Sequence, residues 1–463
     1  MSKFWFIILV IIFNTCHTAN AQSIFVSNIG CDDNDGSLNF PLLSIQKGID
    51  LLEAGDTLYL REGAFYIDKP ILIRKNGNHE KWFSIKAYKG EQVEINGETF
   101  KKSKNIPAGY HGQDGIIDID SSSYIELIGI GVCHSRARGI KITYSNNINI
   151  LNCSSRATYN SGIGVRFTSN LKIFNCEVVD ANNQDYRPYG FKRRREAPQE
   201  AISLMPAWNF EVAYNHVHNN RKEGIDCKED SYHGRIHHNY VHDNDRQGIY
   251  VDSWFGRLHH IEVFENHLHD NDYGIAISAE DDRSSMDSVY IHHNLIYNNR
   301  GSGILFGTFG DNHLRTDLFV FNNTIVNNGS AGHWCGLTGG IEVQSKNIKQ
   351  VKIYNNLIYD NYGFSIGTTF IKSEVINGLK EREIEITNNL CSPEKNIYQT
   401  RNYFDLVIPY NGNSSIEENP EFKLKTFNDF RPQNKIVNKC GINNSSIGIG
   451  DKINTLPRLI LRD

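Results

Sequence analysis

A short sequence unit recurs along most of the chain and limits the folds that are open to it. Each copy has an aromatic residue or His, then Asn, a branched apolar residue, a polar turn and a Gly-Ile-x-apolar motif, as in YNHVHNNRKEGIDC. Most copies follow one another after 23 to 33 residues. The copies are marked by Asn152, Asn175, Asn215, Asn239, Asn266, Asn294, Asn323, Asn356 and Asn389. Such a period predicts a solenoid, because one unit cannot bury its apolar face alone.

The pattern inside each unit decides between the kinds of solenoid. Apolar and polar residues alternate with a period of two, which indicates β-strands and not helices. The leucine consensus of leucine-rich repeats is absent. We therefore predict an all-β fold, a single coiled parallel β-helix, in which stacked Asn side chains satisfy backbone groups at a bend.

The two ends of the chain differ from the repeat. The segment PLLSIQKGIDLLEAGD places Leu42, Ile45, Ile49 and Leu52 on one face of a short helix, which would cap the open end of the solenoid. From Cys391 onward the repeat fades into an irregular closing region. The predicted divisions are an N-terminal cap with the first turns at 22–125, central repeats at 126–390, and C-terminal turns with a cap at 391–463.

Residues 1–21 have the features of a Sec signal peptide. Lys3 precedes an apolar run that ends in small and polar residues and in Ala19-Asn20-Ala21, which predicts cleavage before Gln22. The run is too short for an ordinary membrane-spanning helix, and no other segment is long and apolar enough. We therefore expect a secreted or periplasmic protein without a transmembrane segment.

Charge, cysteine and histidine content give weaker constraints. The net charge of −5 makes no general case for nucleic-acid binding. Cys153 and Cys176 both follow Asn in neighbouring repeats, where they either pair or stack as small half-polar residues. Paired histidines recur before the strand bends, and they are His237, His238, His259, His260, His292 and His293. They lack a conventional zinc spacing, so we expect a ladder on a lateral face rather than a metal site.

One surface of the predicted solenoid gathers charged side chains. With each Gly-Ile strand numbered from its Gly, positions 3, 5 and 7 face outward, and successive turns stack about 4.8 Å apart. The charged and aromatic residues at these positions include Arg166, Asp226, Lys228, Asp230, Tyr250, Asp252, Trp254, Glu280 and Phe309. Several carboxylates on adjacent turns require a cation or a perturbed pKa, which favours a functional groove. A solvated face on which Lys228 balances its neighbours is the alternative.

An insertion between Asn175 and Asn215 carries the basic run KRRR just before a groove strand. Arginine forks suit carboxylates, although such a run also suits a solvated loop. Aromatic faces at the rim suit the apolar faces of sugar rings. The predicted substrate-binding residues are therefore Arg166, Arg193, Arg194, Arg195, Trp254 and Phe309.

The opening turns, GDTLYLREGAFY to EQVEING, resemble those of secreted bacterial right-handed β-helix proteins, which include the family 9 polysaccharide lyases (pectate lyase L-like). The resemblance implies a right-handed coil, a lysine base and a calcium site on a DDGFD-like strand. The matching strand here is KEGID, in which Asp226 fits the last Asp while Lys222 and Glu223 replace the earlier pair. Tyr250 stands where the lysine of a following turn is expected.

The resemblance and the groove together favour β-elimination on an acidic, uronic-acid-containing polysaccharide or oligosaccharide. A base takes the C5 proton and the group on C4, a sugar or water, departs. Lys228 is the candidate base, provided that its pKa is lowered, and Tyr250 is a candidate base or acid. The candidate Ca²⁺ ligands are Asp226, Asp230 and Asp252, with Glu280 on the next turn.

Two alternatives to elimination stay open. The strand GIYVDSW is similar to the nucleophile strand GIWLDW of glycoside hydrolase family 120, which implies a retaining hydrolase with Asp252 as nucleophile and Glu280 as acid/base. A non-catalytic glycan-binding β-helix would instead have spread-out aromatics and no buried charge cluster. Lys228, Arg166 and the basic insertion favour elimination.

Overall fold

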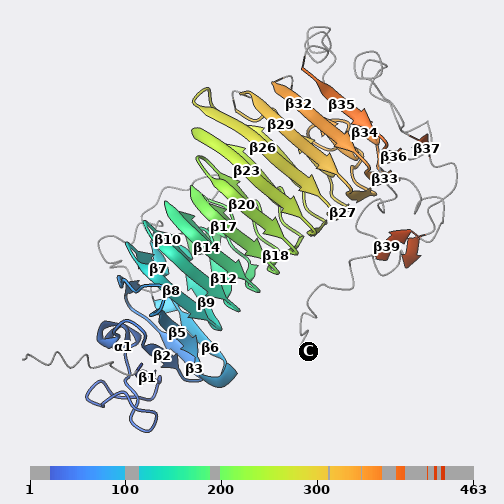
Figure 1. Cartoon of the computed structure of the whole chain (residues 1–463). Coiled ribbons are helices and arrows are strands. Elements are labelled where there is room, and N and C mark those ends of the chain that lie inside the picture. The colour runs from blue at the N-terminus through green and yellow to red at the C-terminus, as the bar shows by residue number, and fades with distance from the viewer. Residues whose placement is uncertain are drawn as a thin grey trace, which may run out of the picture.

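Three long parallel sheets run along the computed structural model and wind it into a right-handed β-helix (Figure 1). The structure describes residues 21–99, 114–187, 199–310, 313–345, 347–367 and 382–391, and the short strands at 414–415, 422–424 and 429–432. Each complete turn adds one strand to each sheet, as β19, β20 and β21 do in succession. The predicted all-β solenoid is confirmed.

The strands of the three sheets have the following bounds. Sheet A contains β1 (Ser23–Val26), β2 (Thr57–Leu60), β5 (Phe83–Ala87), β8 (Ser123–Ile128), β11 (Asn146–Leu151), β14 (Thr168–Phe174), β17 (Ala207–Ala213), β20 (Tyr232–His237), β23 (Gly256–Phe264), β26 (Ser284–His292), β29 (Arg315–Phe321), β32 (Ile348–Tyr354) and β35 (Ile384–Thr387). Sheet B contains β3 (Gly63–Tyr66), β6 (Val93–Asn96), β9 (Ile130–Ser135), β12 (Ser154–Thr158), β15 (Glu177–Val179), β18 (His216–His218), β21 (Tyr240–His242), β24 (His267–His269), β27 (Leu295–Tyr297), β30 (Thr324–Val326), β33 (Leu357–Tyr359), β36 (Leu390–Cys391) and β37 (Ser414–Ser415). Sheet C contains β4 (Ile71–Ile73), β7 (Gly115–Asp120), β10 (Arg138–Thr143), β13 (Ile163–Arg166), β16 (Ile202–Leu204), β19 (Ile225–Lys228), β22 (Ile249–Ser253), β25 (Ile275–Ala279), β28 (Ile304–Phe306), β31 (Ile341–Val343) and β34 (Ile366–Gly367).

The core of the β-helix is built from stacked aliphatic side chains. In sheet C the Ile of each Gly-Ile motif pairs in register with the next, and the column runs through Ile140, Ile163, Ile202, Ile225, Ile249, Ile275, Ile304, Ile341 and Ile366. All of these residues are buried. Burying one such side chain contributes about 1.5–3 kcal/mol, so this column favours the observed register.

The predicted asparagine ladder is present, with a correction at its start. From Asn215 to Asn356 each amide donates to the next Asn and to a backbone carbonyl, as Asn239 does to Asn266 Oδ1 and Val212 O, both at 2.9 Å, and within the described residues the ladder ends at Asn389. Asn152 and Asn175 lie one residue earlier, at bends with positive φ. Cys176 takes the ladder position, since its N–H donates to Asn215 Oδ1 at 2.9 Å. Cys153 and Cys176 are both buried free thiols, so the stacking interpretation holds.

A second asparagine ladder, which the sequence analysis did not assign, follows the short strands of sheet B. Its members donate to one another in the same way, and they are Asn220, Asn244, Asn271, Asn299, Asn328 and Asn361. The residue before each member has positive φ, as in Asn219 (52°) and Asp243 (53°), a conformation that Asn and Asp tolerate better than most residues. The recurring NN and DN dipeptides are therefore bends of the coil.

The N-terminal end is covered as predicted. Helix α1 (Ile45–Leu51) buries Ile45, Gly48 and Ile49 and lies against β1, β2 and β4. Two short 3-10 turns, η1 (Tyr88–Gly90) and η2 (Gln184–Tyr186), interrupt the coil, and β38 (Phe422–Leu424) pairs antiparallel with β39 (Asp429–Pro432). The predicted signal sequence, apart from residue 21, lies outside the described residues. Within the part that is described, no helix is long and apolar enough to cross a membrane.

Candidate functional site

Sheet C presents the predicted groove residues in the expected register. Asp226 lies between Ser203 and Tyr250, and Lys228 pairs with Asp252 across β19 and β22. Asp252 pairs in turn with Ser278 on β25. Because the register follows from the buried Ile column, the same packing that forms the core places these polar groups on adjacent turns.

A buried network of charges occupies the outer side of these turns. Lys228 Nζ lies 2.5 Å from Glu200 Oε2 and 3.0 Å from Asp226 Oδ2. Lys222 Nζ lies 3.3 Å from the other oxygen of Glu200. Arg246 lies 2.9 Å from Glu223, which also pairs with Lys222. These residues are buried apart from Arg246, so the charges interact with little screening by water.

The network shifts the pKa values of its carboxyl groups in opposite directions. Burial alone would raise the pKa of Glu200, but the positive charges of Lys228 and Lys222 outweigh burial and lower it. Burial and the neighbouring Asp252 raise the pKa of Asp226 well above its usual range. Burial and Glu280 likewise raise the pKa of Asp252, against the effect of Lys228. Asp226 and Asp252 lie so close that the charge of one disfavours ionisation of the other, so the pair carries less than two negative charges.

Lys228 itself does not meet the condition set from the sequence. A base role was predicted on the condition that its pKa is lowered, and burial acts in that direction. The charges of Asp226, Glu200 and Asp252 outweigh burial and raise the pKa of Lys228 well above its usual range. In this state of the protein Lys228 carries a proton, because three carboxyl groups stabilise its charged form.

Tyr250 and Glu280 form the second half of the site. The hydroxyl of Tyr250 donates a hydrogen bond to Glu280 Oε1. Burial raises the pKa of both groups, and the neighbouring Asp252 raises that of Tyr250 further. Arg315 lies behind them, fully buried, and donates to the carbonyls of Ile277 and Gly307. Tyr250 is therefore set up to hold and donate a proton rather than to accept one.

A pocket of about 310 Å³ opens over this network. Its lining residues are Gln199, Glu200, Met205, Lys222, Glu223, Lys228, Glu229, Arg246, Tyr250, Asp252, Trp254 and Glu280. Trp254 is 47% exposed at the rim, so its ring is available to a ligand. The backbone N–H groups of Trp254 and Phe255 donate to Glu229 Oε2, which fixes this rim against the turn below.

Several predicted residues lie elsewhere. Asp230 turns away from the network, because its Oδ1 accepts from the backbone N–H of Arg257 at 3.1 Å. Arg166, on β13, is outside the pocket lining, and its guanidinium lies 5.7 Å from the centre of the Phe167 ring. Phe309 contacts the ring of Tyr250 edge-on at 6.0 Å and packs against the apolar cluster around Tyr250, outside the pocket lining. Arg193, Arg194 and Arg195 lie outside the described residues.

The acidic residues that come just before the groove strands were not among the predicted site residues. Glu200 and Glu223 precede the motifs Ala201-Ile202 and Gly224-Ile225 at the same repeat position. Both stand one residue before the Gly or Ala that opens the motif, and so outside the outward positions 3, 5 and 7. Glu200 is the centre of the lysine pairing, so extending the repeat by one residue would have found the main partner of Lys228.

The carboxyl groups of this pocket are suited to bind a hard cation. The residues that fit differ from the predicted calcium ligands. Among the described residues, Asp226 Oδ1, Asp252 Oδ1 and Glu223 Oε2 are buried without a hydrogen-bond partner. Oxygen atoms of this kind are the ligands that Ca²⁺ prefers. Asp230 does not fit, since its carboxylate is engaged with the backbone of the next turn.

The fold and the pocket define a right-handed parallel β-helix with an acidic and basic cleft on one sheet, and comparison with known proteins identifies its family. A family model described as the Pel9A-like right-handed β-helix region matches residues 24–347. The chain therefore belongs to the Pel9A-like right-handed β-helix family.

Two sequence relatives and one solved structure show the range of the similarity. Pectate lyase PEL9 of Emericella nidulans is 37% identical over 109 residues, which are 23% of this chain and 27% of that protein. The uncharacterized protein YwoF of Bacillus subtilis is 26% identical over 377 residues, 76% of this chain and 78% of that one. The mannuronan C-5 epimerase AlgE6 A-module of Azotobacter vinelandii matches with a TM-score of 0.54 at 12% identity, covering 79% of this chain and 92% of that one. At that identity the structural match concerns the fold alone.

Proposed function

We propose that this protein is a carbohydrate-active lyase that performs β-elimination on a uronic-acid-containing polysaccharide or oligosaccharide. The observation that carries the proposal is the buried set of ionisable groups with shifted pKa values that lines the pocket on sheet C. Strongly shifted pKa values of buried groups in a cleft point to a functional site. Membership of the Pel9A-like family and the match to a pectate lyase support the same chemistry.

The proposed reaction divides the proton transfers between two residues. Lys228 Nζ takes the proton from C5 of the uronate, the C4–O bond breaks, and the C4–C5 double bond forms. The departing oxygen takes its proton from the Tyr250 hydroxyl, which the raised pKa keeps protonated at neutral pH. Both groups line the same pocket, at neighbouring turns of the coil.

Lys228 can act as a base only if the surrounding negative charge falls. Asp226 and Glu200 now contact its ammonium and hold the proton there. A bound Ca²⁺ would supply the positive charge that neutralises these carboxylates and the carboxylate of the substrate. Glu223, Asp226 and Asp252 are the residues that would hold it, because they carry the carboxylate oxygens without hydrogen-bond partners. Less negative charge around Lys228 lowers its pKa and so favours its neutral form.

Hydrolysis by Asp252 and Glu280 is less well supported. Glu280 has the raised pKa that a general acid needs. The nucleophile of a retaining pair must be ionised, however, and the pKa of Asp252 is also raised. A purely glycan-binding role predicted no buried charge cluster, and the cluster is present.

The experiment is an elimination assay with a charge-preserving variant. The protein is incubated with pectate and other uronic-acid polysaccharides, and the unsaturated product is followed by its ultraviolet absorbance, with and without Ca²⁺. Lys228→Arg keeps the positive charge but cannot give up its proton near neutral pH, so we expect activity to fall by at least about 10²-fold. Lys172→Arg, on the exposed side of β14, is the matched control and should behave like the wild type.

Three results would contradict the proposal. Reducing sugar released without a rise in absorbance would indicate hydrolysis. A fully active Lys228→Arg protein would remove the base assignment. Activity that survives exhaustive EDTA treatment unchanged would remove the calcium requirement.

A further inference from the structure

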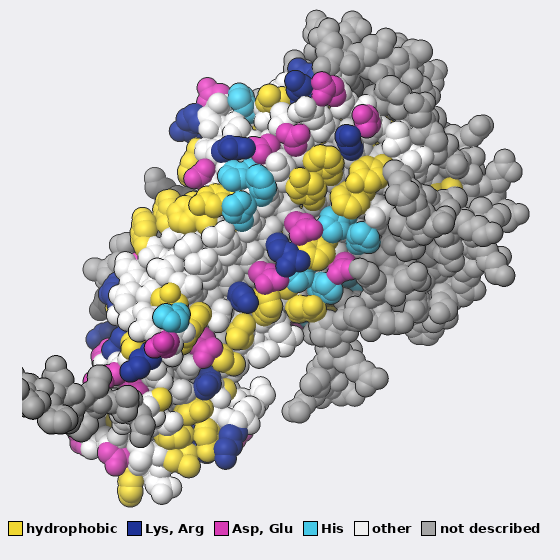
Figure 2. Space-filling model, viewed as in Figure 1, with side chains coloured by type: hydrophobic (Ala, Val, Ile, Leu, Met, Phe, Trp, Pro, Cys, Tyr) yellow, Lys and Arg dark blue, Asp and Glu magenta, His cyan; other side chains and the backbone are white. Residues whose placement is uncertain are grey.

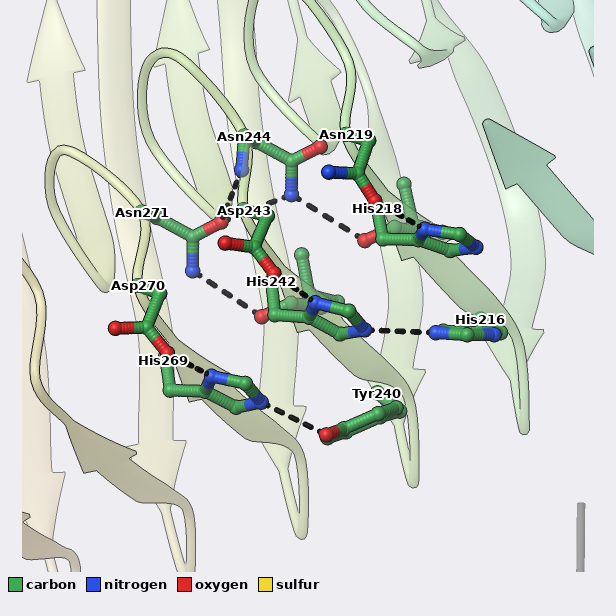
Figure 3. A network of polar contacts seen from close by, with 12 residues as sticks. His216, His218, Asn219, Tyr240, His242, Asp243, Asn244, His269, Asp270 and Asn271 are labelled. Atoms are coloured by element: carbon green, nitrogen blue, oxygen red, sulfur yellow. Dashed lines mark hydrogen bonds and ion pairs between the residues drawn. The ribbon is translucent and has the colours of Figure 1, made fainter. Parts of the chain in front are cut away.

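Sheet B carries a stack of imidazole and phenol rings (Figure 3). The pocket lies on another sheet, sheet C. His218, His242 and His269 occupy the same position on β18, β21 and β24. Their rings are parallel, with His218 and His242 centred 5.1 Å apart and His242 and His269 4.8 Å apart. In the space-filling view, which is drawn from the side of Figure 1, histidines gather in groups rather than being scattered (Figure 2).

Each stacked histidine is oriented through its Nδ1 atom by the residue that follows it. His218 Nδ1 lies 2.7 Å from Asn219 Oδ1, and His242 Nδ1 lies 2.6 Å from Asp243 Oδ2. His269 Nδ1 makes the same contact with Asp270 at 2.6 Å (Figure 3). These oxygen atoms accept, so Nδ1 carries the proton and each Nε2 keeps its lone pair when the ring is neutral. Metal-binding histidines are held in this way by a carboxylate or carbonyl behind the ring.

The Nε2 atoms all point toward the strand of the preceding turn. His242 Nε2 lies 2.7 Å from His216 Nε2, and His269 Nε2 lies 2.9 Å from the Tyr240 hydroxyl (Figure 3). His218 Nε2 lies 3.3 Å from Glu177 Oε1. The partner of Nε2 is therefore a phenol for His269, a second imidazole for His242 and a carboxylate for His218. Imidazoles and carboxylates both bind metal ions.

We propose that His216, His218 and His242, with Glu177 beside them, form a binding site for a divalent transition-metal ion such as Zn²⁺. One ligand atom from each histidine lies within 4.8 Å of the others. His216 and His218 alternate along β18 and so face the same way, and His242 comes from the neighbouring strand in register with His218. Three imidazoles and a carboxylate make a four-coordinate set that suits zinc.

The other histidine group of the described chain lacks these features. His233, His259 and His260 also bring ligand atoms within 4.8 Å, but His233 and His260 are exposed. His259 Nδ1 and His260 Nδ1 face each other at 2.8 Å rather than a carboxylate. The side chains of His216 and His242 are only 16% and 14% exposed, so the first group is both better oriented and better shielded.

A metal ion at this site would join three successive turns of the coil, at β15, β18 and β21. Its effect is independent of the pocket, which lies on another sheet. A ligand that binds only the folded protein raises the midpoint of thermal unfolding. The expected property is therefore metal-dependent stability, not metal-dependent chemistry.

The test is metal binding by the full chain after removal of bound metals with EDTA. Isothermal titration calorimetry should show that the wild type binds one equivalent of Zn²⁺. With Co²⁺ in place of Zn²⁺, the protein should show the visible absorption of a four-coordinate site. His242→Gln and His218→Gln should each weaken Zn²⁺ binding by more than tenfold and abolish the rise in melting temperature. Asp243→Asn, which removes only the carboxylate behind His242, should weaken binding by about tenfold.

The matched control is His292→Gln, a histidine of sheet A that stacks between Phe264 and Phe321. It should bind Zn²⁺ like the wild type. Circular dichroism of each apo variant shows whether the coil is intact. No Zn²⁺ binding by the wild type would overturn the proposal, and so would wild-type affinity in both His242→Gln and His218→Gln. Binding lost in His259→Gln but kept in His242→Gln would move the site to the other group.

Discussion

At the scale of single residues, the pocket is unusual because its charges are buried and mutually dependent. Lys228 and Lys222 share the carboxylate of Glu200, while Asp226 and Asp252 carry raised pKa values. A buried ion pair gives little net stability over an apolar pair, but removing one partner leaves an uncompensated charge. A fold selected only for stability gains nothing from such a network, which agrees with a role in binding or catalysis.

Replacing the shared carboxylate should show this dependence. Glu200→Gln leaves two buried lysines without their main partner, so we expect the free energy of unfolding at pH 7 to fall by about 3 kcal/mol. The pKa of Glu200 is lowered in the folded protein, so its contribution is present above about pH 4.5 and is lost as the pH falls further. Denaturant unfolding at pH 7 and pH 4 measures both effects.

The control for this prediction is Glu262→Gln on sheet A, whose carboxylate pairs at the surface with Arg235 and His292. Exposed pairs contribute about 0–1 kcal/mol, so this variant should unfold almost like the wild type. Equal stability of Glu200→Gln and Glu262→Gln would mean that the buried network has no energetic importance.

The half-buried histidine His267 should make the protein sensitive to acid. Burial lowers its pKa from 6.5 to about 3, so the folded protein resists protonation at this ring. The unfolded chain takes up a proton near pH 6.5, and stability that is complete above this pH is therefore lost as the pH falls toward the folded pKa. Because His267 as a whole is partly exposed, we expect its contribution to the free energy of unfolding to fall by about 1–2 kcal/mol between pH 7 and pH 4.

His267→Gln should reduce the dependence of stability on pH by that amount. Thermal unfolding of both proteins from pH 7 to pH 4, with EDTA present, gives the two slopes. His233→Gln, at an exposed position of β20, is the control. Parallel curves for the wild type and His267→Gln would contradict the assignment.

At the scale of structural elements, the two asparagine ladders hold the bends of the coil. Each ladder Asn satisfies a backbone carbonyl and the next ladder member, so its side chain replaces the hydrogen bonds that the bend cannot make. The neighbouring residue takes positive φ, which lets the chain turn between strands of only three residues. The ladders thus explain why such short strands stack without slipping.

Asn266→Ala should test the ladder at its middle. Asn266 donates to Ile236 O and Asn294 Oδ1 and accepts from the N–H and the side chain of Asn239, all inside the protein. Leaving several buried groups unsatisfied should lower the free energy of unfolding by about 2–4 kcal/mol. Asn146→Ala, at an exposed position of β11, should cost less than about 0.5 kcal/mol in the same denaturant titration. Similar losses in the two variants would contradict a special role for the ladder.

The sequence allowed the type and the register of these elements to be predicted, but not the exact ladder positions or the burial of the charges. The Gly-Ile motif predicted the inward Ile column and the outward register of Asp226 and Lys228, because alternation along a strand is a local property. The ladder was misplaced by one residue at Cys153 and Cys176, since a thiol there breaks the asparagine pattern. Burial of the groove charges depends on side chains from neighbouring turns, and no single repeat contains all of these. The pKa of Lys228 is raised by Asp226, Glu200 and Asp252, which outweigh the lowering effect of burial, and a balance between groups on three turns could not be predicted from one repeat.

At the scale of the whole molecule, stacking converts a linear repeat into a surface. Glu200 and Glu280 belong to turns that are far apart in sequence, yet both line one pocket because each turn adds one strand to sheet C. The same stacking places the imidazole column on sheet B. Each turn contacts mainly its neighbours, so the two surfaces can change independently and damage at one end should remain local.

A charge placed under the N-terminal helix should demonstrate this local behaviour. Ile49→Asp buries a carboxylate where Ile49 packs on the first turn, so we expect the local free energy of opening to fall by about 3–5 kcal/mol. In a solenoid the loss should expose β1, β2 and β4 first, while β19, β22 and β25 keep their protection. Amide hydrogen exchange followed by mass spectrometry resolves these segments. Leu51→Asp, on the exposed side of the same helix, should exchange like the wild type. Faster exchange spread evenly over all three sheets would show instead that the coil unfolds as one cooperative unit.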